Sequence, residues 1–510
     1  MSLSMLLIFL FLFLLVSLIG FMAVHWRKAD MNSLHEWALA GRSFGTIISW
    51  FLVGGDLFTA YTFIAVPAFM YGAGALGFFA IPYTFIVYPL GFLILPKLWS
   101  VSKQHGFITA ADFVRARYDS SLLSLLVAIT GVIATMPYIA LQLAGIQIII
   151  AALGFPTTGL AGEAPLIIAF IVLSVYTYRS GVRAPALIAV VKDILIYIAL
   201  IAAILIIPAK LGGFSAIFAK IPTDKLLLKA PIEGNMNQYS AYLTLAFGSA
   251  LALLLYPHSI NVMLSAKNEN AIRKNMILLA LFSVLLGICA LLGYMALAAG
   301  VEANPRFTAY FQQYKANFAV PALYLDSFPD WFLGIAFAAF AIGGLVPAAI
   351  MSISAANLCT RNIYKEYTRS SVSLKDEAKI AKIISLLIKA GALAFILFLP
   401  LDYIIQLQLL GGIWISQTFP SVIVGLYTRW FDYRALILGW IVGIISGTWG
   451  ILWLNFKSSI YPLKIGDYII PGYLSCYTLI LNFLIAALGT FFIKKMQLKP
   501  SDDLTELFQK

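Results

Sequence analysis

Apolar stretches long enough to cross a lipid bilayer recur along almost the whole chain. An α-helix rises about 1.5 Å per residue, so about 20 apolar residues span the hydrocarbon core. Counted on this basis, the sequence predicts about thirteen transmembrane helices. Charged residues make up 11% of the chain and hydrophobic residues 62%, whereas a soluble domain carries about 25% charged residues. We therefore expect an all-α integral membrane protein.

The first apolar stretch, residues 3–25, lacks a basic segment before it and a small-residue cleavage site after it. We expect a retained helix rather than a signal peptide. With the amino terminus outside, most of the 34 Lys and Arg residues fall in cytoplasmic loops or the carboxyl tail, as is typical of membrane proteins. The sequence thus predicts a multi-pass protein of the cell membrane with a cytoplasmic carboxyl terminus. The net charge of +12 is explained by these loops, without a nucleic-acid partner.

The second apolar stretch, residues 46–70, is interrupted in its middle by Gly54, Gly55 and Asp56. Inside a bilayer, a helix break or a carboxylate is tolerated where it faces protein or a water-filled cavity. Secondary transporters build ion and substrate sites near the midplane from discontinuous helices of this kind. A merely kinked helix, with Asp56 bonded to a neighbour, is the alternative.

The ninth stretch contains a second candidate, residues 347–357, in which small residues and hydroxyls recur. Small residues let helices approach closely, and hydroxyls are ligands for a hard cation. Close packing alone is the alternative interpretation.

Several classes of function are not supported by the sequence. There is no Walker-type phosphate loop, no metal-ligand cluster and no intramembrane nucleophile with its base, so ATP-driven transport and an enzyme are not expected. The short tail after the last stretch argues against a membrane-embedded sensor. We expect the lipid bilayer and a small-molecule substrate as partners, with no cofactor and no obligatory protein partner.

Several short segments resemble, in the same order, those of the sodium:solute symporter family of proline, pantothenate, sugar and monocarboxylate carriers. They are residues 36–43, 54–56, 108–113, 138–147, 256–258, 349–352 and 361–364.

Residues 183–188, followed by Lys192 and Asp193, are most similar to the prokaryotic monocarboxylate carriers of this family, as are residues 409–414. This resemblance implies a symporter that imports a short monocarboxylate (lactate, pyruvate, acetate or propionate) or a small amino acid by alternating access. Another family substrate, such as proline, pantothenate or a sugar, or a solute sensor, is the alternative.

The resemblance also implies a LeuT-type fold of five plus five helices in inverted repeats, with the second and seventh spans broken. The second break is expected at Phe247, Gly248 and Ser249. The implied division is 1–45, the first transmembrane helix and a cytoplasmic loop; 46–208, the first repeat; 209–238, an external loop; 239–427, the second repeat; 428–494, two additional transmembrane helices; and 495–510, a cytoplasmic tail.

The family's sodium site, carried over to this chain, takes backbone carbonyls near Gly54 and Leu57, the carbonyl of Ala349 and the hydroxyl of Ser352, with Asp56 in the same segment. Two positions depart from the family. Ile353 stands where a second hydroxyl is usual, and Ala189 where an Asp is frequent.

Because losing an oxygen ligand weakens a cation site, the coupling ion is left open between sodium and a proton, with uncoupled passage as a third alternative. Asp56, Lys192 and Asp193 are the candidates for proton coupling. Lys389, near a span end, is expected to snorkel to the membrane interface.

A substrate cavity combines apolar or aromatic walls with a few oriented polar groups. The candidates for substrate binding are Thr59, Thr62, Tyr138, Gln142, Trp414 and Gln417.

The four histidines lie at span ends or in loops, and we expect them to have structural roles.

Overall fold

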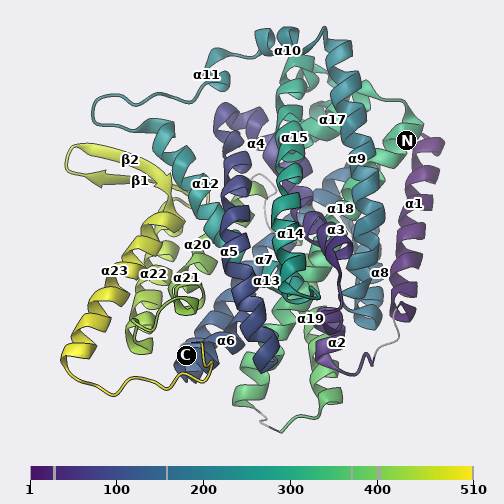
Figure 1. The fold of residues 1–510 in the computed structure, drawn as a ribbon. Helices are drawn as coiled ribbons and strands as arrows, with labels where there is room; N and C mark the ends of the chain where they lie inside the picture. The colour runs from purple at the N-terminus through teal and green to yellow at the C-terminus, as the bar shows by residue number, and fades with distance from the viewer. Residues whose placement is uncertain (1, 27–29, 157–158, 369–370, 399–403, 508–510) are drawn as a thin grey trace.

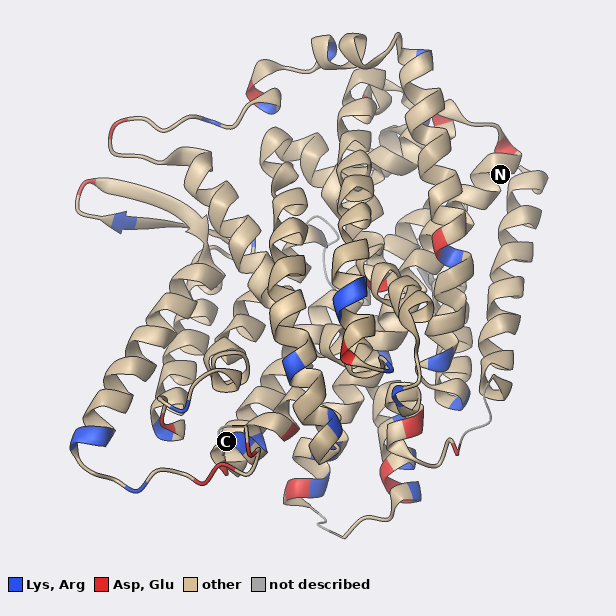
Figure 2. Cartoon of the chain, viewed as in Figure 1, with Lys and Arg blue, Asp and Glu red and all other residues tan. Residues whose placement is uncertain are grey.

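The computed structural model describes residues 2–26, 30–156, 159–368, 371–398 and 404–507. The chain forms a bundle of long helices, and the two termini lie at opposite ends of it (Figure 1). Lys, Arg, Asp and Glu gather toward the two ends, while few of them lie in the band between (Figure 2). This is the distribution expected of a protein whose middle band is surrounded by lipid.

The α-helices of the described residues include long spans and short connecting pieces. Their bounds are α1 (Leu3–Met22), α2 (Leu34–Leu39), α3 (Thr46–Leu57), α4 (Val66–Ala73), α5 (Ala80–His105), α6 (Ala110–Tyr118), α7 (Ser121–Ala152), α8 (Gly159–Ser180), α9 (Arg183–Leu211), α10 (Phe214–Lys220), α11 (Thr223–Leu226), α12 (Asn237–Leu255), α13 (Pro257–Leu264), α14 (Glu269–Leu278), α15 (Ala280–Ala299), α16 (Thr308–Tyr314), α17 (Ala319–Ser327), α18 (Asp330–Leu358), α19 (Leu374–Phe398), α20 (Ile404–Ile415), α21 (Phe419–Val422), α22 (Tyr433–Trp453) and α23 (Leu474–Lys495).

Ten helical segments of the described chain are long and apolar enough to cross a membrane. Two shorter apolar helices, Thr46–Leu57 and Ala164–Ser180, accompany them. A mostly helical membrane architecture is thereby confirmed, whereas the count of thirteen spans is not. One reason is that Tyr61–His105 forms one continuous helical segment, whereas the sequence predicts two separate spans over these residues.

The helix α18 forms the centre of the bundle and packs against α7, α1, α9 and α19. From Phe332 onward nearly all of its side chains are buried. Its many Ala and Gly residues allow neighbouring helices to approach closely.

The first break lies just beyond the expected position. Gly54, Gly55 and Asp56 are still helical, and the chain leaves α3 at Phe58, with φ −84° and ψ 86°. A π-helical turn, Tyr61–Ala65, then leads into α4. Glycine costs a helix only about 1 kcal/mol, so these two glycines do not end it.

The two glycines instead permit close packing. A Cβ on Gly54 would lie 2.2 Å from the Phe282 ring, and one on Gly55 would lie 3.1 Å from both Ala189 Cβ and Lys192 Nζ. The sequence therefore identified the broken span, but the prediction that these glycines interrupt the helix is wrong.

The second break separates α12 from α13 at Tyr256, with φ −57° and ψ 134°. The expected break at Phe247, Gly248 and Ser249 is wrong, because α12 is continuous through these residues. The physical cause of the actual break is Pro257, since a residue that precedes proline is driven toward an extended conformation.

The helices α22 and α23 pack against each other at one edge of the bundle. Beside them lies an antiparallel hairpin of β1 (Ile460–Ile465) and β2 (Tyr468–Tyr473), which the sequence did not predict (Figure 1). The division into inverted repeats and the side of the membrane on which each terminus lies stay predictions.

Candidate functional site

The two breaks meet in the interior, because α13 packs directly against α3. Asp56, near the end of α3, is 5% exposed, and His258, in the first turn of α13, is 1% exposed. Asp56 Oδ2 lies 3.7 Å from His258 Nε2. This separation exceeds a hydrogen bond and leaves the two groups facing each other across a short gap.

Aromatic rings enclose this pair. His258 packs edge-on against Tyr138 of α7, with ring centroids 5.4 Å apart, and against Tyr256 at 5.1 Å. In the described part of the chain, Asp56 Oδ1 and both ring nitrogens of His258 have no hydrogen-bond partner. Buried polar atoms are normally satisfied, so these atoms indicate a place for a ligand or water.

Sequence reasoning missed the position of His258. It assigned the residue to a span end and a structural role, whereas the structure places it in the interior beside Asp56. The available signal was Pro257, which marks the break and hence the residue that follows it.

Polar side chains hold the backbone of the first break. Thr62 Oγ1 donates to the Leu57 carbonyl at 2.7 Å, and Thr59 Oγ1 accepts from the backbone N–H of Tyr61 at 3.0 Å. Gln142 reaches across from α7, and its Oε1 accepts from the Ala60 N–H at 3.0 Å. The break is thus a defined structure rather than a frayed helix end.

Gln142 Nε2 has no hydrogen-bond partner among the described residues. The amide therefore retains a donor close to the break. The structure brings together Asp56, Thr59, Thr62, Tyr138 and Gln142, which the sequence had proposed from separate spans.

Lys192 approaches the same backbone from α9, which packs along α3. Its Nζ donates to the carbonyls of Gly55 at 2.6 Å and Phe58 at 2.9 Å, and lies 3.1 Å from Asp193 Oδ1. Lys192 is fully buried, and Asp193 is 1% exposed. A buried ammonium is tolerated only with such partners, and the break supplies two of them.

The other half of the predicted sodium site lies on α18. Ser352 Oγ donates to the Ala349 carbonyl at 2.8 Å and lies 3.2 Å from Ser385 Oγ of α19. Lys389 Nζ in turn donates to Ser385 Oγ at 3.2 Å. The expectation that Lys389 snorkels is wrong, because this residue is fully buried where α19 packs against α18 and α7.

Trp414 and Gln417 donate hydrogen bonds to the outer helices α22 and α23. Trp414 Nε1 donates to Thr448 Oγ1 of α22 at 3.2 Å, and Gln417 Nε2 donates to Thr478 Oγ1 of α23 at 2.9 Å. Asn482 Nδ2 also donates to Gln417 Oε1, at 3.1 Å. Their role in substrate binding stays a prediction.

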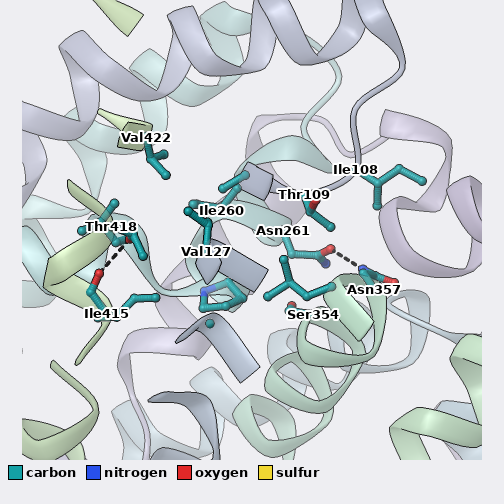
Figure 3. A pocket seen from close by; sticks show the side chains of 15 residues that line it. Ile108, Thr109, Val127, Ile260, Asn261, Ser354, Asn357, Ile415, Thr418 and Val422 are labelled. Carbon is teal, nitrogen blue, oxygen red and sulfur yellow. Dashed lines mark hydrogen bonds between the residues drawn. The ribbon is translucent and has the colours of Figure 1, made fainter. Parts of the chain in front are cut away.

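A small cavity adjoins α13 and is lined by Ile260 and Asn261 of that helix (Figure 3). Asn261 and Asn357 meet in its wall, where Asn357 Nδ2 donates to Asn261 Oδ1 at 3.0 Å. Thr109, at the start of α6, and Ser354 of α18 also line it. The cavity thus extends a polar lining from α13 to α6, near one end of the molecule.

Ionic groups bind α6 to the end of α18 and the start of α19. Asp112 Oδ1 accepts from Asn362 Nδ2 at 2.8 Å, and its Oδ2 lies 3.5 Å from Arg361. Arg361 and Lys365 each lie 3.3 Å from Glu377. These contacts connect α6 with the start of α19 at the end toward which the cavity extends.

The comparisons with known proteins agree with this architecture. Residues 37–443 match the sodium:solute symporter family. The chain is 50% identical to a "Monocarboxylate transport permease protein" of Rhizobium johnstonii, over 94% of this chain and 95% of that protein. It is 34% identical to the uncharacterized symporter YodF of Bacillus subtilis, over 87% of each.

A solved structure of a Na+-coupled sialic acid symporter, in a substrate-bound outward-open state, is similar in fold. It has a TM-score of 0.77 at 13% identity and covers 98% of this chain and 99% of that one. The expected LeuT-type architecture and the expected family are therefore confirmed. The chain belongs to the sodium:solute symporter family, a family of cation-coupled transporters of small solutes.

Proposed function

We propose that this protein imports a short monocarboxylate, such as lactate, pyruvate, acetate or propionate, or a small amino acid, together with a cation. The observation that carries the proposal is the 50% identity to the Rhizobium johnstonii protein, which extends over 94% of the chain. The family membership supports cation-coupled symport, and the interior of the molecule supports a small substrate.

The groups that meet between the breaks suit a small carboxylate. Tyr138, Tyr256 and His258 pack against one another, with ring centroids 5.1–5.4 Å apart, so the surroundings of the imidazole are aromatic. The unpartnered nitrogens of His258 and Gln142 offer donors to a carboxylate. The amino-terminal end of α13, where His258 lies, adds a partial positive charge. Few convergent polar groups in an otherwise apolar cavity are typical of small-molecule sites.

The charge of Asp56 makes substrate binding depend on a cation. An ionised Asp56 repels an approaching carboxylate unless a cation or a proton compensates its charge. Binding of the two ligands is then mutually favourable, and such reciprocal coupling is the thermodynamic basis of symport.

The geometry of transport follows from the two repeats that we assign to residues 46–208 and 239–427. Each contributes one broken span to the centre, α3 with α4 and α12 with α13. Rocking of these elements around the site would expose it alternately to the two sides. We assign the end that carries α2 and α6 to the cytoplasm, with the amino terminus outside.

The test is counterflow of labelled solute into proteoliposomes that contain the purified protein and an excess of the unlabelled solute. The panel is lactate, pyruvate, acetate, propionate, alanine, proline and pantothenate, with protein-free liposomes as the control for passive entry. We expect lactate or another short monocarboxylate to exchange. Exchange of proline or pantothenate alone would assign the protein to another branch of the family.

A further inference from the structure

Lys192 reaches from α9 into the first break and holds its backbone there. Both carbonyls that it contacts, those of Gly55 and Phe58, belong to the turn where α3 ends. Carbonyl oxygens at such breaks are the groups with which broken-helix transporters coordinate a cation. In this chain an ammonium, fully buried, is already bonded to two of them.

The remaining groups of the predicted sodium site are also engaged within the protein. The Gly54 carbonyl accepts from the Phe58 N–H at 2.8 Å, and the Leu57 carbonyl accepts from Thr62 Oγ1 at 2.7 Å. The Ala349 carbonyl accepts from Ser352 Oγ at 2.8 Å. At the two departing positions, Ile353 and Ala189 offer no side-chain oxygen.

A second buried ammonium lies beyond the α18 half of this site. Lys389 Nζ bonds to Ser385, whose hydroxyl contacts Ser352. A sodium ion would therefore compete with Lys192 for the carbonyls of the break, and it would be repelled by the charge of that ammonium. The residues present do not fit a sodium ion in addition to the two lysines.

We propose that the ammonium of Lys192 takes the place of the sodium ion, so that the ion coupled to transport is a proton. This inference rests on the proposed function and names the coupling ion of that same site. The protonated lysine holds α3 through two charge-assisted hydrogen bonds, which are stronger than those of a neutral amine.

The cycle moves one proton in each turn. When the site faces the cytoplasm, an N–H bond of Lys192 breaks, its electron pair stays on Nζ, and the proton passes to water. The weakened contacts then release the end of α3. Lys192 takes up a new proton after the site has returned to the outside.

The groups that face Lys192 allow this titration. Asp193 is its ion-pair partner, and Asp56 of α3 interacts with it electrostatically, with His258 behind Asp56. Tyr197 lies one turn further along α9, close to Asp193. Of the other helices packed on α9, α1 and α15 carry no charged residue, and α18 carries one at its first position. The remaining three carry their charged residues toward their ends: Asp326 on α17, Glu163 and Arg179 on α8, and Lys220 on α10.

The experiment measures accumulation of labelled lactate in proteoliposomes under an imposed sodium gradient or an imposed pH gradient, with protein-free liposomes subtracted. A gradient of one pH unit supports up to about tenfold accumulation for one proton per substrate. We expect the pH gradient to drive uptake by the wild-type protein and the sodium gradient to have no effect. Sodium-driven accumulation, without an effect of pH, would overturn the proposal.

Two variants of Lys192 and one control variant test whether Lys192 is the residue that carries the proton. Lys192→Arg keeps the positive charge but does not release its proton. Lys192→Met removes both the positive charge and the proton that could be released. We expect both to lose pH-driven accumulation, while Lys192→Arg still binds lactate in a thermal-shift assay. Lys210→Met, on the same helix, removes an ammonium that donates to the Ser327 carbonyl at 2.6 Å and should behave as wild type. Wild-type accumulation by Lys192→Arg would contradict the proposal.

A measurement without substrate separates this inference from the proposed function. The melting temperature of the purified protein is compared in sodium and potassium chloride of equal concentration. A bound ion stabilises the folded state by mass action, so a sodium site would raise the melting temperature in sodium only. We expect equal values. A sodium-specific rise would refute the role of Lys192 even if no monocarboxylate is transported, whereas equal values without counterflow would remove only the proposed substrate.

Discussion

His258 reaches Asp56 because Pro257 turns the chain away from the axis of α12. The imidazole and the carboxylate then face each other from the two broken spans, with 3.7 Å between Nε2 and Oδ2. Asp56 Oδ1 and both ring nitrogens of His258 have no hydrogen-bond partner among the described residues. We propose that the substrate carboxylate binds at this pair, where the charge of the substrate interacts with the two side chains.

The variant His258→Phe tests this role. It keeps a ring packed against Tyr138 and Tyr256 but removes both nitrogens. A hydrogen bond to a charged group contributes about 1.5–3 kcal/mol, so lactate counterflow at low substrate concentration should fall at least about tenfold. The control is His25→Phe, at the exposed end of the first span. Unchanged counterflow in a correctly folded His258→Phe protein would exclude a direct role.

The packing of Gly54 predicts a loss of stability on a small substitution. In Gly54→Ala, the new methyl group would meet the Phe282 ring at 2.2 Å, and overpacking of this kind costs about 1–3 kcal/mol. The melting temperature in detergent should fall. Gly72→Ala is the matched control, since nothing lies within 4 Å of its added Cβ. Equal melting temperatures for the two variants would contradict the packing described.

Sequence reasoning located many groups of the site because charge inside an apolar span is visible without a structure. Asp56, Lys192 and Asp193 were identified in this way. It could not show that Lys192 bonds to the Gly55 and Phe58 carbonyls, because that contact depends on how α9 packs along α3. His258 was missed for the same reason, since its partner comes from a distant span.

At the scale of elements, proline and glycine have different effects in this molecule. Pro257 ends a helix, whereas Gly54 and Gly248 lie inside helices where a neighbouring side chain approaches closely. Hydropathy predicted the apolar spans but not where two of them break. It also missed the β1–β2 hairpin, whose short strands lie between the last two spans.

The contacts between α6 and the start of α19 predict how one end of the molecule is closed. Asp112 bonds to Asn362 and to the backbone of Ile108, and pairs with Arg361. Asp112→Asn should loosen this end and increase the rate at which a thiol reagent labels Cys359, which lies at the junction after α18. We expect an increase of about tenfold, from the loss of hydrogen bonds to a charged group.

Two features make this labelling measurement specific. Cys289 and Cys476 are buried, whereas Cys359 is partly accessible. The control is Asp376→Asn, because Asp376 bonds locally to Ser373 at the exposed start of α19. Equal labelling rates in the two variants and the wild type would show that the Asp112 contacts do not close this end.

At the scale of the whole molecule, the chain combines the fold of the sodium:solute symporter family with an interior that holds two buried lysines, Lys192 and Lys389. The shared fold follows from apolar periodicity and family resemblance, which the sequence carries along its whole length. The coupling ion does not follow from the fold, because it depends on a few atoms at the first break. Lys192 and Ile353 are the residues that distinguish this interior from the site that the family resemblance implies.

Cation-coupled transport is tested most directly by measuring whether the purified protein concentrates a monocarboxylate against its gradient. Labelled lactate uptake into proteoliposomes is measured under an imposed cation gradient, with and without an ionophore that dissipates it. Cation-coupled transport predicts accumulation above the external concentration, which the ionophore abolishes. Equilibration to the external concentration alone, unaffected by the ionophore, would show a passive carrier and contradict cation-coupled transport.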